Sequence, residues 1–386
     1  MLMMKSRIRH IPEEIIDKIL SKLSVKSLAR FKCVSKTWKS LISNMEGQER
    51  SFFYLEFNEG NMLFYAVDKE LVVEKLPTPF LGLSSKENFK FLGSCNGLLL
   101  FSVSRCIYLW NPTTRCCKEV LQLNFLSEKF LISASGICFD DSTNDYKVVM
   151  SLASYTIDMK FALVGSLKSK EWSQINFPYA MARSGCYVNG RLHWIVREKK
   201  LDAHSIVYSD PKTHPQLIVY FDAKTLEFKE LPMPDNVYII GELKVVDGCL
   251  CMAHRTNYKC KILIMKEYGV KESWTTIWNG AVPKWKPKGQ RFRRPGINSQ
   301  ILTNTSEELL VAKFRRLWAF SVWGLKLNLK ENSVEFPSKN CSDDMSWDTY
   351  IESLAPVHGE TPDINRHMKK FEDKIRWLPE SNDPIE

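Results

Sequence analysis

The segment Val188-Asn-Gly-Arg-Leu-His-Trp194 carries the pattern on which the fold prediction rests. It places a glycine, one variable residue and a leucine ahead of further apolar residues. The same order recurs as Gly97-Leu-Leu and Gly248-Cys-Leu-Cys, and Gly136-Ile-Cys-Phe fills a fourth place more loosely. A segment that returns at intervals along a chain indicates one structural unit used several times.

A second repeated feature is a bulky or apolar residue followed three positions later by an aliphatic one. The copies are Cys117/Val120, Trp172/Ile175, Phe228/Leu231 and Trp274/Ile277, at intervals of 55, 56 and 46 residues. A turn-like segment precedes each copy: Asn111-Pro-Thr-Thr, Lys168-Ser-Lys, Asp222-Ala-Lys-Thr and Tyr268-Gly-Val-Lys. Each turn joins two strand-like runs, and residues 52–57 and 206–208 are further runs of this kind.

A strand–turn–strand unit repeated at this spacing is typical of kelch-like propeller blades. Weaker units near Val73 and Leu76 and over residues 309–336 bring the total to about six blades in roughly 300 residues. Ring closure would hide the apolar faces and open edges of the units. We therefore expect an α+β multidomain chain: a small three-helix module, then an all-β repeat domain, a β-propeller of about six blades. A β-sandwich or an open β array is the alternative.

Composition fits a globular protein kept in a reducing compartment. The 386 residues include 54 Lys and Arg against 44 Asp and Glu, so the formal net charge is +10, and 44% of the residues are hydrophobic. No apolar run approaches the roughly 18 residues of a membrane-spanning helix, and residues 1–9 do not have the order of a secretory signal. The eleven cysteines are irregularly spaced, which favours free thiols. We expect an intracellular protein, in the cytoplasm, the nucleus or both.

The first 50 residues differ from the rest in charge and in period. They hold eleven Lys and Arg and five Asp and Glu, which is more than half of the excess charge. Pro12 suits the first position of a helix, and Ile15, Ile19 and Leu23 recur every four residues beside Ile16 and Leu20. A second helix is expected over residues 25–33, and a third after Ser35 as N-cap, ending near Asn44. Three helices this short cannot bury their apolar surface alone, which predicts a partner protein.

The run from Ile11 to Ile42 closely resembles the F-box of plant F-box proteins. The features that carry this resemblance are the proline that opens the first helix, the Val25-Lys-Ser-Leu28 turn and the Val34-Ser-Lys-Thr-Trp38 entry to the third helix. Two positions depart from the family: Ile11-Pro12 replaces a Leu-Pro opening, and Leu23-Ser24 replaces a second Leu-Pro. The resemblance implies docking on a Skp-type adaptor and, through it, a cullin and a RING protein, which together form an SCF ubiquitin ligase.

Carried over by position, the resemblance assigns adaptor contacts to seven residues: Ile11, Pro12, Ile16, Leu20, Leu23, Leu28 and Trp38. Trp38 would be the aromatic anchor. Four basic residues, Lys26, Arg30, Lys36 and Lys39, would attract an acidic partner surface. The alternative is that the apolar residues form only the core of the helical module.

Residues 90–350 resemble the F-box-associated domain that follows the F-box in many plant proteins. The matching segments are Gly93-Ser-Cys-Asn-Gly-Leu-Leu, Trp110-Asn-Pro-Thr-Thr-Arg115, Asp145-Tyr-Lys-Val-Val149, Val188-Asn-Gly-Arg-Leu-His-Trp194 and residues 265–274. In that family the domain recruits the target protein. The implied organisation is an F-box domain at residues 8–48, the β-repeat domain at 50–354 and a short, partly helical tail at 355–386.

No motif in the sequence indicates catalysis, a metal or a cofactor. Cys249, Cys251, His254 and Cys260 come nearest to a metal cluster, but the first two have the spacing of one strand face. His193 and Trp194 fit the repeat core, and the Asp140, Asp141 and Asp145 group fits a turn. We therefore expect no enzyme activity and no cofactor.

The basic segment at residues 284–294 interleaves six charges with two aromatic rings. We expect a surface loop there and assign target contacts to five residues: Trp285, Arg291, Phe292, Arg293 and Arg294. The predicted function is a non-catalytic substrate-recognition adaptor of an SCF ligase with an unknown target, no membrane partner and no main role in binding nucleic acid. The alternatives are an F-box protein whose β domain binds nucleic acid, or one that binds a glycan or small ligand.

Overall fold

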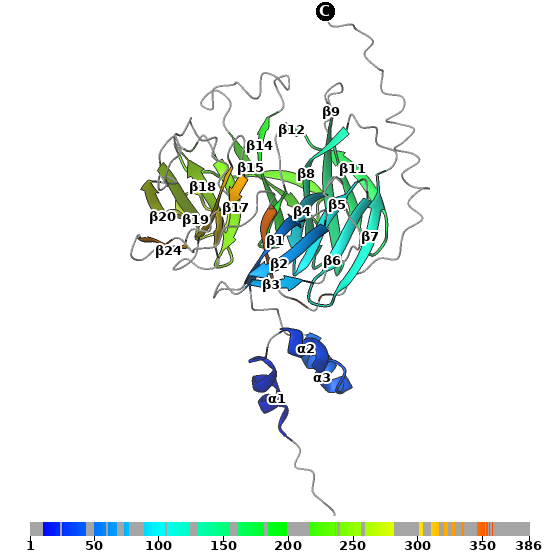
Figure 1. Ribbon diagram of the computed structural model, residues 1–386. Helices are drawn as coiled ribbons and strands as arrows, with labels where there is room; N and C mark the ends of the chain where they lie inside the picture. The colour runs from blue at the N-terminus through cyan, green and yellow to red at the C-terminus, as the bar shows by residue number, and fades with distance from the viewer. Residues whose placement is uncertain are drawn as a thin grey trace, which may run out of the picture.

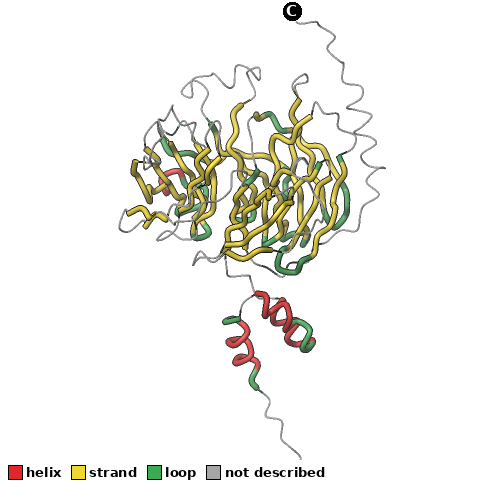
Figure 2. The backbone as a smooth tube through the Cα atoms, in the orientation of Figure 1, coloured by secondary structure: helices red, strands yellow, loops and turns green. Residues whose placement is uncertain are grey.

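The computed structural model describes the following part of the chain. It comprises residues 11–23, 25–43, 50–58, 61–67, 73–76, 89–104, 106–123, 130–154, 161–180, 184–198, 216–235, 237, 240–255, 259–281, 301–303, 310–315, 320–322, 326–328, 333–335, 346–351, 353, 355 and 357. The strand expected at 206–208 and the tail from 358 lie outside it. These residues form a group of three short helices and an all-β part (Figures 1 and 2).

The helices are α1 (Glu13–Leu20), α2 (Val25–Phe31) and α3 (Lys36–Ser43). Pro12 is the N-cap of α1 rather than its first residue, with φ −55° and ψ 141°, and its carbonyl accepts the Ile15 N–H. Because proline forces extended backbone on the residue before it and has no N–H, it ends the preceding segment without leaving an unpaired donor. Ser35 caps α3 as predicted, since its Oγ accepts the Trp38 N–H at 3.1 Å. α2 ends two residues before the predicted position.

The strands form separate antiparallel sheets, which we call blades 1 to 6. Blade 1 is β26 (Ser346–Ile351), β1 (Arg50–Asn58), β2 (Asn61–Val67) and β3 (Val73–Leu76). Blade 2 is β4 (Phe89–Cys95), β5 (Leu98–Val103), β6 (Cys106–Asn111) and β7 (Cys116–Gln122). Blade 3 is β8 (Phe130–Asp140), β9 (Asp145–Ser154), β10 (Phe161–Ser166) and β11 (Trp172–Asn176).

Blade 4 is β12 (Tyr179–Ala180), β13 (Cys186–Val188), β14 (Arg191–Glu198), β15 (Leu217–Asp222) and β16 (Glu227–Leu231). Blade 5 is β17 (Ile240–Val246), β18 (Cys249–Arg255), β19 (Lys259–Met265) and β20 (Trp274–Ala281), with the short helix η1 (Lys271–Ser273) before β20. Blade 6 is β21 (Ile301–Thr303), β22 (Leu310–Arg315) and β23 (Phe320–Val322). The pair β24 (Lys326–Asn328) and β25 (Ser333–Glu335) contacts β22.

The blades stand side by side and meet through their inner strands, as a propeller requires (Figure 1). β26 contacts β4, β4 contacts β8, β8 contacts β14, β14 contacts β17, and β17 contacts β21. These strands approach closely because small residues face one another: a Cβ on Gly93 of β4 would lie 3.1 Å from the Cα of Gly136 in β8. The predicted ring of about six units is confirmed, and the sandwich alternative is wrong.

The Gly-x-Leu repeat marks a hairpin near the start of a blade, between β4 and β5, between β13 and β14, and between β17 and β18. In each of three hairpins both turn residues have positive φ, which defines a type I′ turn. The pairs are Asn96 (48°) with Gly97 (76°), Asn189 (51°) with Gly190 (71°) and Asp247 (48°) with Gly248 (73°). The fourth copy is a correction, because Gly136 lies inside β8 and the β8–β9 turn comes later, at residues 141–144.

The second repeat marks the outermost strand of blades 2 to 5. Its copies lie on β7, β11, β16 and β20, and each turn segment connects that strand to the strand before it, as expected for turns that join two strands. The Asp222 side chain holds one such turn, because its Oδ1 accepts the N–H groups of Lys224 and Thr225. Asn111 does the same before β7, where its Oδ1 accepts the N–H groups of Thr113 and Thr114.

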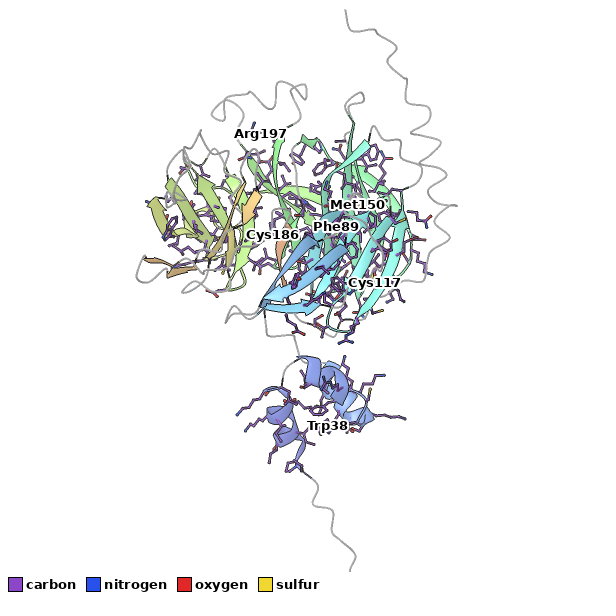
Figure 3. The ribbon with its side chains drawn as sticks, viewed as in Figure 1. Trp38, Phe89, Cys117, Met150, Cys186 and Arg197 are labelled. Atoms are coloured by element: carbon purple, nitrogen blue, oxygen red, sulfur yellow. The ribbon has the colours of Figure 1, made fainter. Side chains whose placement is uncertain are left out.

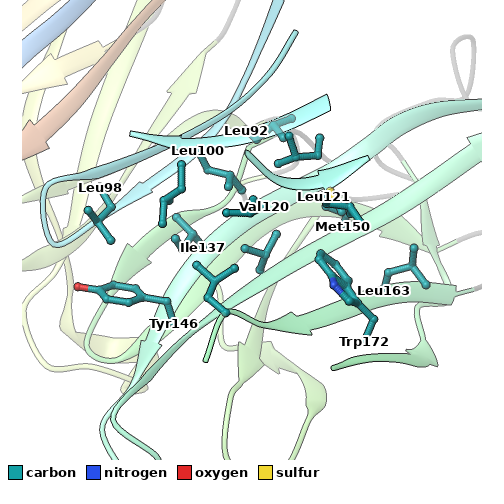
Figure 4. Packing of buried hydrophobic residues seen from close by; sticks show 14 of the residues in the cluster. Leu92, Leu98, Leu100, Val120, Leu121, Ile137, Tyr146, Met150, Leu163 and Trp172 are labelled. Carbon is teal, nitrogen blue, oxygen red and sulfur yellow. The ribbon is translucent and has the colours of Figure 1, made fainter. Parts of the chain in front are cut away.

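Apolar clusters fill the spaces between consecutive blades rather than one central core. The cluster between blades 2 and 3 is shown in Figure 4, where Leu100 and Val120 of blade 2 meet Ile137, Met150 and others of blade 3. Similar clusters lie between blades 1 and 2, between blades 3 and 4, and between blades 4 and 5. Burial of this surface between sheets is the main favourable contribution to the fold.

Blade 1 is closed by strands from opposite ends of the sequence. β1 pairs with β26 in a regular register from Arg50↔Ile351 to Leu55↔Ser346. The residues after β26 then cross to blade 2, where the Asn111 side-chain amide donates to the carbonyls of Ser353 (3.1 Å) and Ala355 (2.8 Å). Val357 is buried in the cluster between blades 2 and 3, so the fold continues past the expected boundary at residue 354.

His193 and Trp194 are core residues, as predicted. His193 is 0% exposed, its Nδ1 lies 3.2 Å from the Cys186 carbonyl, and its Nε2 lies 2.7 Å from the Tyr268 hydroxyl. A carbonyl can only accept, so Nδ1 carries the proton and Nε2 accepts from Tyr268. Burial lowers the pKa of His193 to about 4, so this link between blades 4 and 5 uses the neutral ring.

We predict that Asn111→Ala lowers the free energy of unfolding by about 3 kcal/mol, measured by urea denaturation. The substitution removes the two donors that hold Ser353 and Ala355 and the acceptor that holds the turn before β7. The control is Thr114→Ala in the same turn, at an exposed side chain, for which we expect a change within about 0.5 kcal/mol. Equal stability of the two variants would contradict the role given to Asn111.

We predict that His193 makes the protein less stable in acid. Its pKa of about 4 in the folded chain is below the ordinary 6.5, so the unfolded chain binds more protons as the pH falls from about 6.5 to 4. Between pH 7 and pH 5 this accounts for a loss of about 2 kcal/mol in unfolding free energy. His193→Gln keeps a donor and an acceptor but does not titrate. Urea denaturation at both pH values tests the prediction, and identical pH dependence of the two proteins would contradict it.

Candidate functional site

Helix α1 is apolar on two sides, which is unusual for a helix eight residues long. One side turns inward: Leu20 is 0% exposed, and Ile16 and Leu23 pack against it. The other side turns outward, where Ile15 is 48% and Ile19 is 49% exposed. An amphipathic surface helix normally carries charged or polar residues on its outer side.

The inward side builds the core of the helical group. Leu20 of α1, Leu28 of α2 and Ile42 of α3 are buried together. Trp38 is half-buried against them and meets the Phe31 ring edge-to-face, with centroids 5.5 Å apart (Figure 3 labels Trp38). Three buried side chains make a small core, which leaves the outward apolar side without cover among the described residues.

The outward side consists of Ile11 (53% exposed), Ile15 (48%) and Ile19 (49%), which we call the isoleucine stripe. Ile15 and Ile19 are four residues apart on one edge of α1, and Ile11 precedes the N-cap Pro12. Val34, between α2 and α3, is 59% exposed, and it is the fourth large apolar residue exposed in the described part of the chain. Several such residues on one small module indicate an interaction site rather than scattered surface residues.

The seven residues expected to contact an adaptor therefore fall into three groups. Ile11 and Pro12 are exposed. Ile16, Leu23 and Trp38 are half-buried, and Leu20 and Leu28 are buried within the helical group itself. Ile15, Ile19 and Val34 were not among the predicted contacts. The period of four that selects Leu23 also selects Ile15 and Ile19, so the signal was present but did not identify the outward side.

The charge around the stripe is one-sided. From residue 18 to residue 43 the sequence holds seven Lys and Arg and no Asp or Glu. Arg30, Lys36 and Lys39 are exposed, and the side chain of Lys26 lies outside the described set. Partial burial and the nearby Lys39 charge lower the pKa of Lys32. The acidic residues of α1, which include Asp17, lie in its first five positions. The surface of α2 and α3 therefore favours an acidic partner.

Other groups that could carry chemistry are occupied by structural contacts. Asp140 accepts from the amine of Lys147 at 2.7 Å, and these contacts keep its pKa below the ordinary value although burial acts to raise it. The buried thiol of Cys138 has its pKa raised to about 12, mainly by burial, and is therefore unreactive. Cys249 and Cys251 pack in one cluster on one face of β18, as their spacing predicted.

Within the described ranges, no group of three or more His, Cys, Asp or Glu side chains could hold a metal ion. No described helix is long and apolar enough to cross a bilayer. The five target contacts assigned to the basic segment, Trp285, Arg291, Phe292, Arg293 and Arg294, lie outside the described residues, as do the side chains of His254 and Cys260. Their assignment stays a prediction.

Comparison with known proteins places both parts of the chain. A family model of the F-box domain matches residues 8–47, and a model of the F-box associated beta propeller domain matches residues 36–357. An F-box/kelch-repeat protein of Arabidopsis thaliana is 28% identical over 302 residues, covering 69% of this chain and 79% of the relative. The F-box protein CPR1 of Arabidopsis thaliana is 27% identical over 417 residues, covering 96% of this chain and 94% of the relative. The helical group at residues 11–43 is followed in the sequence by a propeller of antiparallel blades, in agreement with both family models. The chain belongs to the plant F-box proteins that carry an F-box associated beta propeller domain.

Proposed function

We propose that this chain is the substrate-recognition adaptor of an SCF-type E3 ubiquitin ligase. The observation that carries the proposal is the uncovered isoleucine stripe on a helical group that matches the F-box domain. The helical group docks on a Skp-type adaptor, which connects it to a cullin and a RING protein. The propeller holds a target protein for ubiquitination. The chain itself supplies no catalytic residue and no cofactor, and it works inside the cell, in the cytoplasm, the nucleus or both.

The docking contact is assigned to the stripe, with Ile11, Ile15 and Ile19 entering an apolar groove of the adaptor. Burial of three isoleucines that are each about half exposed supplies the affinity. The exposed basic side chains Arg30, Lys36 and Lys39 speed the encounter with an acidic adaptor surface. Leu20 and Leu28 act indirectly in this proposal, because they hold α1 in place from within the core.

The segment that connects α3 to β1 supports separate roles for the two ends of the propeller, with the helical group attached at one end and the target bound at the other. Six residues, 44–49, lie between α3 and β1 and span no more than about 25 Å. β1 begins at Arg50, whose partner Ile351 lies two residues before Ser353. Ser353 contacts Asn96, in the turn between β4 and β5, and the side chain of Asn111, before the turn between β6 and β7. The helical group is therefore attached at the end of the propeller where these turns lie, which we call the short-turn end.

Target binding is assigned to the opposite end of the propeller. β20 begins at the short-turn end and runs to the opposite end, and β21 starts at that opposite end and runs back. Residues 281 and 301, which flank the basic segment, therefore both lie at the opposite end. A target held there is kept at a fixed distance from the ligase by the propeller. Ubiquitination then follows from raised local concentration instead of from chemistry in this chain. No contact among the described residues favours a nucleic-acid or glycan ligand.

We predict that the double substitution Ile15→Ser and Ile19→Ser weakens binding to a purified Skp-type adaptor by about 100-fold, measured by isothermal titration calorimetry. Serine and isoleucine have similar helix propensities and both side chains are exposed, so the helix itself should persist.

The matched control is Asp17→Ser, an exposed position on the same helix, which should leave the affinity within about twofold. Circular dichroism of each variant checks that the helices are retained. Unchanged affinity of the Ile15/Ile19 variant would remove the stripe from the docking surface. Failure of the wild-type chain to bind any Skp-type adaptor would overturn the proposed function as a whole.

A further inference from the structure

Among the described strands, each blade ends in an outer strand that pairs with a neighbour on one side only. In the five blades with four or more strands these outer strands are β3, β7, β11, β16 and β20. Such an edge can pair with a strand from another molecule, and proteins usually prevent this with charged side chains or with β-bulges. A comparison of the five edges therefore shows where pairing is left open.

Four of the outer strands carry such protection. β3 has exposed Glu74 and Lys75, and β16 has Glu227, Lys229 and Glu230 in five residues. β7 contains Lys118 and Glu119, and its pairing with β6 shifts register. β20 has no charged residue, but its pairing with β19 also shifts register, between Ile262 and Leu263. A bulge of this kind twists the edge and breaks the row of unpaired groups.

The outer strand of blade 3, β11 (labelled in Figure 1), has neither form of protection. Its sequence is Trp-Ser-Gln-Ile-Asn, and its five residues pair with β10 without a shift, from Gly165↔Trp172 to Phe161↔Asn176. The side chains of Ser173, Gln174 and Asn176 are exposed and uncharged. Among the described residues no strand pairs with its outer edge.

The strand is also held rigidly, which a docking edge requires. Trp172 is 8% exposed in the cluster between blades 2 and 3. A Cβ at Gly165 would come within 2.4 Å of the Trp172 ring, so the ring lies directly on the neighbouring backbone. The residue after β11, Phe177, is buried between blades 3 and 4. Both ends of the strand are therefore anchored in separate cores.

One face of β11 borders a partly open aromatic surface. Ile175 packs at the rim of the cluster between blades 3 and 4, together with Tyr179 and Phe228. These side chains are half-buried, and the Phe228 ring lies 4.9 Å from the Phe177 ring. A strand added beside β11 would place every second side chain on this face.

We propose that the outer edge of β11 binds an extended peptide segment of the target protein by β-strand addition. The site fits a neutral segment with apolar side chains at alternate positions, which meet Ile175 and Phe228, and with hydroxyl or amide side chains between them, which meet Gln174 and Asn176 on the other face of the strand. The inference rests on the proposed function, because it assigns to the target an unfolded recognition segment. A five-residue edge is short for a stable dimer, which favours a peptide over a second copy of the chain.

The test uses a phage-displayed library of random nine-residue peptides selected on the full-length chain. We expect the recovered peptides to alternate apolar and polar residues and to lack a central proline. Their binding, measured by fluorescence anisotropy with synthetic copies, should fall about tenfold or more in the variant Ser173→Lys with Asn176→Lys, because charges on an edge resist an added strand. Amide exchange within residues 172–176 should slow when the peptide binds.

The matched control is Thr276→Lys, at an exposed position on the outer strand β20, which should leave peptide binding unchanged. Recovery of no binder, or equal binding by wild type and the β11 variant, overturns the proposal. A concentration-dependent dimer that the β11 variant loses would assign the edge to a second copy and also overturn it. Adaptor affinity is measured in parallel on the same variants. Its retention in the β11 variant separates failure of this inference from failure of the proposed function.

Discussion

The pairing of β1 with β26 is the contact on which the rest of the architecture depends. It joins residues about 300 positions apart and closes the first blade, so the loop-closure entropy of the whole propeller is opposed by this one ladder and by the contacts around it. Asn111 strengthens the closure from blade 2, because its side chain makes hydrogen bonds in both directions, to the turn before β7 and to the residues after β26. Because β1 is also the first strand after α3, the same ladder fixes where the helical group is tethered.

The helical group and the propeller differ in how completely they bury their apolar side chains. In the propeller each sheet has a neighbour, and the clusters between blades bury Trp110, Trp194 and Phe221 almost completely. Among the described residues, the three helices pack around a core of three buried side chains, Leu20, Leu28 and Ile42. The isoleucine stripe is the surface that remains. A module of this size gains stability when a partner covers such a surface, so binding and folding are thermodynamically linked in it.

Local patterns in the sequence were sufficient to predict the helices, the repeated turns and the blade architecture. Ser35 as a cap and Asp222 in a turn act on residues two or three positions away, and such contacts follow from residue type and spacing. The contact of Asn111 with Ser353 spans 242 positions, and no local pattern encodes it. The exposure of Ile15 and Ile19 was not predicted for a related reason. A period of four identifies an apolar stripe on a helix, but packing with the other helices decides which of two stripes is buried. Gly136 matched a turn motif, but it lies where the inner strands β4 and β8 approach closely. Glycine is needed there because a side chain would not fit between the strands, and not because the backbone turns.

The order of the closing strands has a consequence for synthesis on the ribosome. The three helices are complete after about 43 residues, but β1 cannot find β26 until residue 351 has left the exit tunnel. At roughly 5–20 residues per second the interval is on the order of 15–60 s. During that time a nascent chain can present its isoleucine stripe while its first blade is still open. If the stripe docks on an adaptor as proposed, messages with a premature stop codon before residue 346 would yield chains that occupy the adaptor without a closed ring and act as dominant-negative products.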